Sequence, residues 1–221
     1  MKLSILIALL AIVAYLIGSI NSAILVSRLL RREDIRKTGS GNAGTTNIWI
    51  AYGRKAGILT AGGDLLKAVI AVLIARLLTD LSGNSLPFDP GYLAGFFVLI
   101  GHVFPLFFAF KGGKAVMPAV GVIALVDPPV FVFLVLLAIC VFVLSRKISV
   151  VSLCCACALP LATIVVRLIK HESIIYPLCF TILYSILVVA VHRDNIRRLV
   201  QGNERTIGKS RDVKSSSESR E

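Results

Sequence analysis

The chain has 221 residues, of which 57% are hydrophobic and 16% are charged, and its mean hydropathy is +0.86. Soluble domains are about 45–50% apolar and about 25% charged, and a domain of this size cannot bury so much apolar surface away from water. The composition therefore excludes a water-soluble enzyme, a disordered chain and a disulfide-stapled secreted domain. The net charge of +12 then indicates basic cytoplasmic loops beside anionic lipid and metabolites rather than nucleic-acid binding.

Apolar stretches along the chain predict the membrane spans. The first, residues 3–30, is too long for the apolar region of a signal peptide, so we interpret it as a span. The others cover 58–78, 92–110, 115–126, 130–144, 150–169 and 174–191. Crossing a bilayer takes about twenty apolar residues, so the fourth and fifth stretches are short. They are separated by Asp127-Pro128-Pro129, and form either two tilted spans or one helical hairpin that enters from one side.

Basic residues predict the orientation. An outside N-terminus and a cytoplasmic C-terminus place most of the 24 Lys and Arg on the inner side, whereas a six-span hairpin arrangement would move Arg146 and Lys147 outside. We therefore predict an all-α polytopic membrane protein with seven transmembrane helices. It forms a single domain over residues 1–207, followed by a disordered polar tail over 208–221. The five cysteines lie in apolar stretches without metal-ligand spacing, so no metal site is predicted.

A glycine-rich segment, GSGNAGTTN over residues 39–47, follows the first span. Its glycines let backbone N–H groups converge on one point, and such a concavity binds phosphate or another oxyanion. Side chains from Ser40 to Asn47 add neutral hydrogen-bond donors around it. The segment is not a Walker loop, because no Lys-Ser/Thr pair follows the last glycine. The alternative interpretation is a flexible polar loop.

A second segment carries Lys111-Gly112-Gly113-Lys114 at the inner end of the third span. Two lysines around a Gly-Gly pair make a compact cationic site with an accessible backbone, and lysine acts as a point charge for phosphate. Anchoring by inside-positive charge would explain the lysines but not the glycines. His102 lies well within the span, where a polar ring usually faces the bundle interior and bonds to a backbone carbonyl. We therefore assign His102 a structural role.

The last span ends in a third segment, HRDNIRRLVQGNE. If the helix continues through it, His192 and Asn195 share one face, which places a titratable ring beside an amide at the membrane interface. Arg193 and Arg197 would form a neighbouring cationic stripe, and Glu204 would pair with one of them. A basic stop-transfer end explains the arginines but leaves His192 and Asn195 unexplained.

Two phosphate-suited segments and one His/Asn face on a single membrane surface imply phosphorylated reactants, at least one of which carries a lipid chain. In this order and spacing, the three segments resemble the signature loops of the bacterial acyl-phosphate-dependent glycerol-3-phosphate acyltransferase family. YLIGSI near the N-terminus and DLLKA in the second span add to the likeness. The resemblance extends over about residues 12–207.

The resemblance implies a seven-span inner-membrane enzyme of phospholipid synthesis that works without a cofactor. It would move a fatty acyl group from acyl phosphate to the 1-hydroxyl of glycerol 3-phosphate, giving lysophosphatidic acid and phosphate. Neither acyl-CoA nor acyl carrier protein would serve as the direct donor. Its partners would be the two substrates, the bilayer and an upstream enzyme that forms acyl phosphate, with no nucleic acid.

Site residues are implied by the same motifs. Substrate or phosphate binding falls to Ser40, Gly41, Asn42, Gly44, Thr46, Asn47, Lys111, Gly112, Gly113, Lys114 and Arg193. His192 and Asn195 would lie at the reacting centre, and Glu204 would be structural, as His102 is. The general base is either His192 or a substrate phosphate, whose second pKa is about 6.

Several positions depart from the family pattern. Ile50 stands where the family has an arginine, and Arg54 would replace that cation if this stretch is one helix; Asn21 stands where a proline is usual. The alternatives are a divergent paralogue with another acceptor or no activity, and a transporter of a phosphorylated metabolite. A transporter should carry polar residues along a mid-membrane pathway. Asp64 and Lys67, by contrast, are predicted to form an i, i+3 ion pair near the inner end of the second span.

Overall fold

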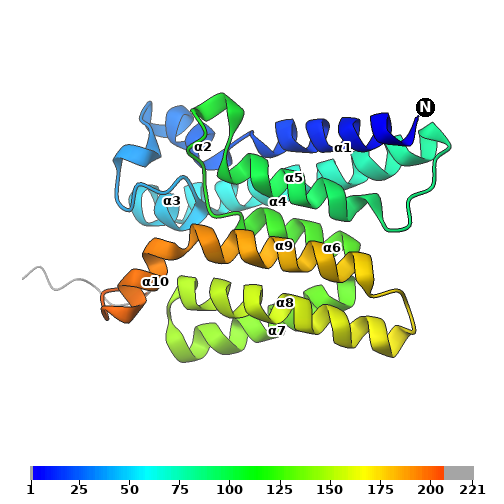
Figure 1. Ribbon diagram of the computed structural model, residues 1–221. Helices are drawn as coiled ribbons and strands as arrows, with labels where there is room; N and C mark the ends of the chain where they lie inside the picture. Colours follow the sequence, from blue (N-terminus) through cyan, green and yellow to red (C-terminus); the bar gives the residue numbers. More distant parts are fainter. Residues whose placement is uncertain (1, 207–221) are drawn as a thin grey trace, which may run out of the picture.

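The computed structural model describes residues 2–206, and every regular element within them is a helix (Figure 1). In chain order the elements are α1 (Leu3–Gly18), α2 (Ser22–Arg31), η1 (Ile35–Lys37), α3 (Thr45–Tyr52), α4 (Arg54–Ser82), α5 (Pro90–Val103), η2 (Leu106–Phe108), α6 (Val116–Val126), α7 (Pro128–Ser145), α8 (Ile148–Lys170), α9 (Ile175–Val191) and α10 (Arg193–Val200). The predicted tail over 208–221 lies outside the described residues, as do both ends of the predicted domain over 1–207.

The long helices run side by side between the two ends of a bundle (Figure 1). Within residues 2–206, five helical segments are long and apolar enough to cross a membrane, and α9 with α10 qualifies as a bent sixth. One of the five combines α1 and α2, whereas α6, with 11 residues, falls below this length. The all-α integral membrane protein that the sequence predicts is therefore confirmed. The count of seven spans and the orientation stay predictions.

The two short apolar stretches form α6 and α7, which are separated at Asp127. Pro128 begins α7, a position where the missing N–H of proline costs no hydrogen bond. α6 starts just after Lys114, which contacts Asn195 of α10. It ends at Asp127, which contacts Arg167 near the C-terminal end of α8. α6 crosses from one end of the bundle to the other and α7 returns (Figure 1), and the choice between two short spans and a hairpin that enters from one side stays a prediction.

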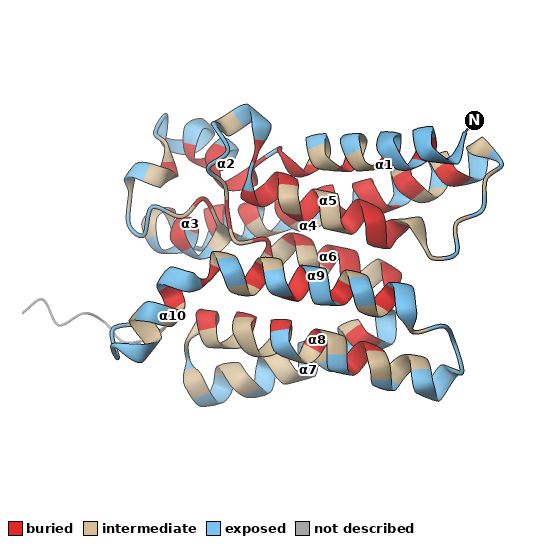
Figure 2. Cartoon of the chain, viewed as in Figure 1, coloured by how far each residue is buried: buried red, intermediate tan, exposed pale blue. Residues whose placement is uncertain are grey.

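Burial is concentrated in α5 and its neighbours, whereas in α7 only Val130 is buried and the other residues are intermediate or exposed (Figure 2). Glycines let α1 and α5 pack closely: a Cβ on Gly18 would overlap the backbone of Val98, and one on Gly101 would overlap the carbonyl of Tyr15. Small residues are the usual means of close helix packing in membranes, where hydrophobic association is absent. The glycines of α1 and α5 therefore bring the two helices together, and large apolar side chains such as Leu6, Leu10 and Leu99 fill the core around them.

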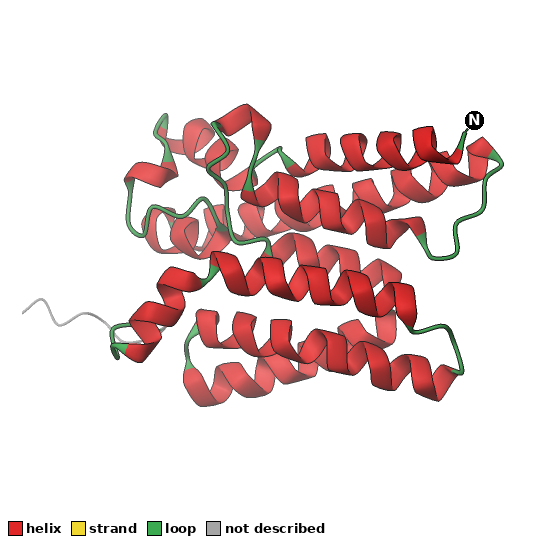
Figure 3. Cartoon of the chain, in the orientation of Figure 1, coloured by secondary structure: helices red, strands yellow, loops and turns green. Residues whose placement is uncertain are grey.

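The two ends of the bundle have different connections (Figure 3). The site end is the end that carries segments 32–44, 104–115 and 192–204. The far end carries segments 83–89 and 171–174 together with Asp127. The glycine-rich segment, the second segment and the third segment all belong to the site end, so the rest of the bundle serves to hold that end in shape.

Candidate functional site

The three signature segments contact one another at the site end. Arg36, just before the glycine-rich segment, donates from Nη1 to the carbonyls of Phe108 at 2.7 Å and Lys111 at 3.1 Å in the second segment. Lys114 of the second segment donates to the amide oxygen of Asn195 in the third. The structure thus brings the three predicted segments together on one surface.

The glycine-rich segment folds back on the start of α3. Gly39 and Gly41 have φ of 64° and 73°, left-handed conformations that favour glycine. The Asn47 side chain fills the resulting turn: Oδ1 accepts the Ser40 N–H at 3.0 Å, and Nδ2 donates to the carbonyls of Ile35, Thr38 and Asn42 at 2.9 to 3.3 Å. Asn47 is only 2% exposed. It holds the loop together, which differs from the predicted role of a phosphate ligand.

Donor groups remain on the outer side of this segment. Ser40 and Thr46 are exposed, and Asn42 and Gly44 are partly exposed. Gly44 is the N-cap of α3, which begins at Thr45. The first turn of α3 therefore directs backbone N–H groups and the positive end of the helix dipole toward the same side. This arrangement suits an anion.

Gly112 and Gly113 do not present free N–H groups, contrary to the prediction of an accessible backbone. They donate to the carbonyls of Val103 at 3.0 Å and His102 at 3.1 Å, at the end of α5. A Cβ on Gly112 would overlap the His102 carbonyl, and one on Gly113 would overlap the His102 ring. The two glycines are therefore required for close packing against α5, and this packing places the two flanking lysines at the site end.

An open depression of about 430 Å³ lies between the first and second segments. It is lined by Asp34, Arg36, Lys37, Gly41, Ala109, Lys111 and Gly112. Arg36 is held by Asp34, at 2.7 Å from Nη2 and 3.0 Å from Nε, as well as by the two carbonyls of the second segment. The hydrogen bond from Arg36 lowers the pKa of Asp34, so this pair stays ionised. Lys37 and Lys111 are exposed and are the cations of the lining that an anion can reach.

Sequence reasoning did not single out Arg36 as a site residue, because it precedes the glycine-rich motif. The only signal was the short spacing between Asp34 and Arg36, which fits a local ion pair. Its bonds to the second segment join positions more than 70 residues apart in the chain, and no local pattern announces such a contact.

α9 and α10 meet at His192 with a bend of 59°, so the condition that the helix continues straight through this segment is not met. His192 Nδ1 lies 2.7 Å from the carbonyl of Val188. A carbonyl only accepts, so Nδ1 carries the ring proton and Nε2 carries the lone pair. Burial lowers the pKa of His192, and the ring is therefore neutral at about pH 7. A buried neutral imidazole with Nε2 as acceptor can act as a general base.

Asn195 joins the second and third segments. Its Oδ1 accepts from the Lys114 ammonium, and its Nδ2 donates to Glu204 Oε1 at 2.6 Å. Glu204 Oε2 in turn accepts from Arg198 Nε at 2.8 Å. Glu204 thus pairs with an arginine as predicted, but with Arg198 rather than with either member of the predicted stripe. Burial lowers the pKa of Lys114. Its ammonium is hydrogen-bonded to Asn195, and through Asn195 it is linked to Glu204.

Two further cations named from the sequence are Arg54 and Arg193. α3 ends at Tyr52, Gly53 has a φ of 85°, and α4 begins at Arg54. The condition under which Arg54 would replace the missing cation, a single helix through Ile50 and Arg54, is therefore not met. Ile50 is 56% exposed and belongs to the apolar outer surface. Arg193 is exposed at the start of α10.

His102 is 2% exposed and faces the bundle interior, as predicted. Its Nδ1 lies 2.9 Å from Lys67 Nζ and 3.5 Å from Asp64 Oδ1, where a bond to a backbone carbonyl was expected. The predicted Asp64–Lys67 ion pair is confirmed, at 3.0 Å. Within residues 2–206, no group of three or more His, Cys, Asp or Glu side chains is arranged to hold a metal ion.

The chain resembles glycerol-3-phosphate acyltransferases over most of its length. The family profile of that description matches residues 8–202. The glycerol-3-phosphate acyltransferase of Syntrophotalea carbinolica is 39% identical over 195 residues, which cover 86% of this chain and 92% of that one. The Bacillus subtilis protein of the same name is 38% identical over 199 residues, 90% of this chain and 96% of its own.

Solved structures show the same likeness. The crystal structure of PlsY, an integral membrane glycerol 3-phosphate acyltransferase, in its glycerol 3-phosphate form superposes with a TM-score of 0.78 at 34% identity. The match covers 91% of this chain and 96% of that one. The lysophosphatidic acid form of PlsY gives a TM-score of 0.73 at 32% identity, covering 91% and 95% of the two chains.

Proposed function

The chain belongs to the glycerol-3-phosphate acyltransferase family, and we propose that it transfers a fatty acyl group from acyl phosphate to the 1-hydroxyl of glycerol 3-phosphate. The products are lysophosphatidic acid and inorganic phosphate. The observation that best supports this proposal is the cationic depression at the site end, lined by Lys37 and Lys111. The lining residue Gly112 is close in the chain to Lys114. Lys114 contacts Asn195 in the third segment, which begins with the neutral His192.

Glycerol 3-phosphate is a small anion, and the depression has the charge to receive its phosphate. Lysine ammonium groups neutralise phosphate as point charges, while hydroxyl and backbone donors at the start of α3 supply direction. We assign phosphate and substrate binding to Ser40, Gly41, Asn42, Gly44, Thr46, Lys111, Gly112, Lys114 and Arg193, with Lys37 added. Asn47 and Gly113 support these residues by holding the two loops in place.

The donor is a mixed anhydride with phosphate as a good leaving group, so no covalent enzyme intermediate is needed. The 1-hydroxyl oxygen attacks the acyl carbonyl carbon, the bond from that carbon to the phosphate oxygen breaks, and the hydroxyl proton passes to Nε2 of His192. Asn195 and Lys114 lie in one hydrogen-bonded chain and offer donors to the charge that develops on the acyl oxygen and the departing phosphate.

The acyl chain requires an apolar surface beside this polar site. Trp49 and Ile50 on α3 and Phe107 on η2 are 45%, 56% and 57% exposed at the site end, a setting typical of the membrane interface. We infer that the donor and the product keep their chains in the lipid there, in the inner membrane of a bacterium. Since acyl phosphate hydrolyses in water, an upstream enzyme that forms it would supply the donor.

The test is phosphate release from acyl phosphate by the purified, detergent-solubilised protein, with and without glycerol 3-phosphate. We expect release that depends on glycerol 3-phosphate, with lysophosphatidic acid formed in equal amount and with acyl-CoA inert as donor. Release without that dependence would indicate hydrolysis or another acceptor. No release from folded protein would overturn the proposal and indicate a divergent paralogue without this activity.

A further inference from the structure

A buried ionic cluster that the proposed reaction does not use lies directly behind two loops of the site end. The first loop comprises residues 32–44, and the second loop comprises residues 104–115. Asp64 and Lys67 of α4 and His102 of α5 are 1%, 5% and 2% exposed. Ionisable groups within membrane-spanning segments are costly and commonly functional. Apolar residues often replace a buried ion pair without loss of stability, so stability alone is a weak reason for this cluster.

Lys67 is the centre of the cluster. Its ammonium lies 3.0 Å from Asp64 and 2.9 Å from Nδ1 of His102. It also donates to the carbonyls of Gly18 at 3.1 Å and Ile20 at 2.7 Å. These two carbonyls belong to the break between α1 and α2, where no following helical turn supplies N–H partners. The ammonium therefore fixes both the break and the orientation of the imidazole.

His102 transmits the position of Lys67 to the second loop. A Cβ on Gly113 would overlap Nε2 of His102 and would lie 2.7 Å from the carbonyl oxygen of Ala43. Gly113 is thus packed between the imidazole and the first loop. A movement of the ring displaces the backbone of Gly113, and with it the two lysines of the second loop.

The break between α1 and α2 transmits the position of Lys67 to the first loop. Ile20 is followed by Asn21, whose Oδ1 caps the first turn of α2 at 3.0 Å and whose Nδ2 donates to the carbonyl of Ala43 at 3.4 Å. The cluster therefore reaches the contact between Ala43 and Gly113 from both sides.

On the basis of the proposed function, we propose that Lys67 is a positioning residue for the acceptor. It sets the separation of the first and second loops, and through it the affinity for glycerol 3-phosphate, without touching the substrate. Because the depression between these loops receives the acceptor, the effect falls on the KM for glycerol 3-phosphate. The KM for the donor and kcat depend on the third segment and change less.

The test compares the double variant K67M/D64N with R167M/D127N, which removes a buried ion pair at the far end. Removing both charges avoids leaving a lone buried carboxylate, the usual cause of unfolding in such variants. We expect K67M/D64N to raise the KM for glycerol 3-phosphate at least about tenfold while kcat and the donor KM stay within about threefold. The far-end variant leaves all three constants unchanged.

A conservative variant adds a second comparison. Arginine keeps the charge of Lys67, but its planar guanidinium does not reproduce the compact ammonium. K67R is therefore expected to give a smaller rise in the same KM. If K67M/D64N does not fold, K67R carries the test, and an unchanged KM for glycerol 3-phosphate in K67R would overturn the proposal.

Trp49 provides a readout that does not require turnover. It is the single tryptophan of the sequence, it lies on α3 just after the first loop, and it is 45% exposed. We expect K67M/D64N to change the quenching of Trp49 fluorescence by acrylamide, and R167M/D127N to leave it unchanged. A wild-type protein without activity would defeat the proposed function, while this comparison would still decide the positioning role. Unchanged quenching together with an unchanged KM in folded K67M/D64N, or equal effects in the far-end variant, would overturn it.

Discussion

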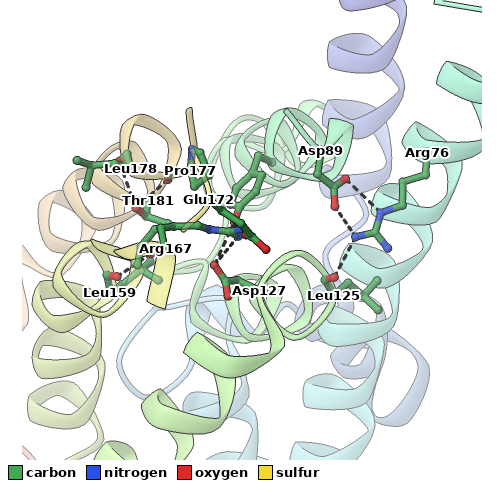
Figure 4. A network of polar contacts seen from close by, with 12 residues as sticks. Arg76, Asp89, Leu125, Asp127, Leu159, Arg167, Glu172, Pro177, Leu178 and Thr181 are labelled. Atoms are coloured by element: carbon green, nitrogen blue, oxygen red, sulfur yellow. Dashed lines mark hydrogen bonds and ion pairs between the residues drawn. The ribbon is translucent and has the colours of Figure 1, made fainter. Parts of the chain in front are cut away.

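Both ends of the bundle bury an ionic cluster, but the two clusters hold different partners. At the site end, the ammonium of Lys67 binds two backbone carbonyls and a ring nitrogen as well as a carboxylate. At the far end, the guanidinium of Arg167 binds side-chain oxygens: Asp127 at 2.7 Å, Tyr92 at 2.9 Å, and Glu172 (Figure 4). The first cluster fixes irregular backbone, whereas the second joins regular helices.

The sequence positions of the far-end acids explain this difference. Asp89 and Asp127 immediately precede α5 and α7, where a carboxylate is favoured by the helix dipole. They pair with Arg76 of α4 and Arg167 of α8 (Figure 4), and so tie helix starts to neighbouring helices. This function requires only the fold. We therefore expect changes at the site end to alter the reaction and changes at the far end to alter stability.

The largest expected effect at the site end is that of H192A. Loss of the proposed general base should lower kcat per folded molecule by about 10²–10⁴-fold. H171A, at an exposed histidine of the far end, is the matched control and should retain wild-type kcat. Near-normal turnover by H192A would show instead that a substrate phosphate takes the proton.

The pH profile tests the same assignment independently. Burial lowers the pKa of His192, and the base is active only when neutral, so kcat should fall on the acid side below the ordinary histidine value of about 6.5. The residual rate of H192A should lack this decline. A decline that persists in H192A would assign it to the phosphate of a substrate.

The next largest effect is expected at the far end. R167M leaves Asp127, which is 2% exposed, without its cation, and an uncompensated buried charge costs about 3–5 kcal/mol. The free energy of unfolding in mixed micelles should fall by that amount, while kcat per folded molecule stays at the wild-type value. R146M, at an exposed arginine, should change neither. A lower kcat in folded R167M would contradict the division of labour between the two ends.

A smaller effect at the site end is expected for N47A. Asn47 makes four hydrogen bonds within the first loop, and their loss should let the loop move and raise the KM for glycerol 3-phosphate about tenfold. T45A is the neighbouring control, because the Thr45 hydroxyl has no hydrogen-bond partner among the described residues. Equal kinetic effects of N47A and T45A would show that the bonds of Asn47 do not matter for binding.

The sequence predicts the elements of this molecule better than its polar contacts, and Asn47 shows why. Apolar stretches long enough to span a bilayer exist only as helices there, so composition and length predict the bundle. The i, i+3 pairing of Asp64 and Lys67 follows from helix geometry alone. The partners of Asn47 exist only after Gly39 and Gly41 have turned the loop back, and no spacing rule describes that turn.

The same reasoning applies to the glycines of the second segment and to the bend at His192. The motif indicates that Gly112 and Gly113 are special, but only the packed structure shows that their N–H groups serve the end of α5. The bend depends on which neighbours form hydrogen bonds with the carbonyls of the last turn of α9 and which pack against its side chains. Long-range packing decides both features, and it leaves no periodic signal in the sequence.

The smallest expected effect separates a binding cation from a general surface charge. Lys37 lines the depression and is exposed, so its attraction for phosphate is worth only about 0.4–1 kcal/mol, in the upper part of the range for exposed ion pairs in water. K37A should therefore raise the KM for glycerol 3-phosphate about two- to fivefold at low salt, and the difference should shrink at about 0.5 M salt because exposed charges are screened. K55A removes an exposed lysine at the same end that does not line the depression, and it should leave the KM unchanged. If K37A and K55A weakened binding equally, the acceptor would be attracted by the overall positive charge of the site end. The depression would then have no specific role in binding the acceptor, and Lys67 could not change the affinity for glycerol 3-phosphate through it.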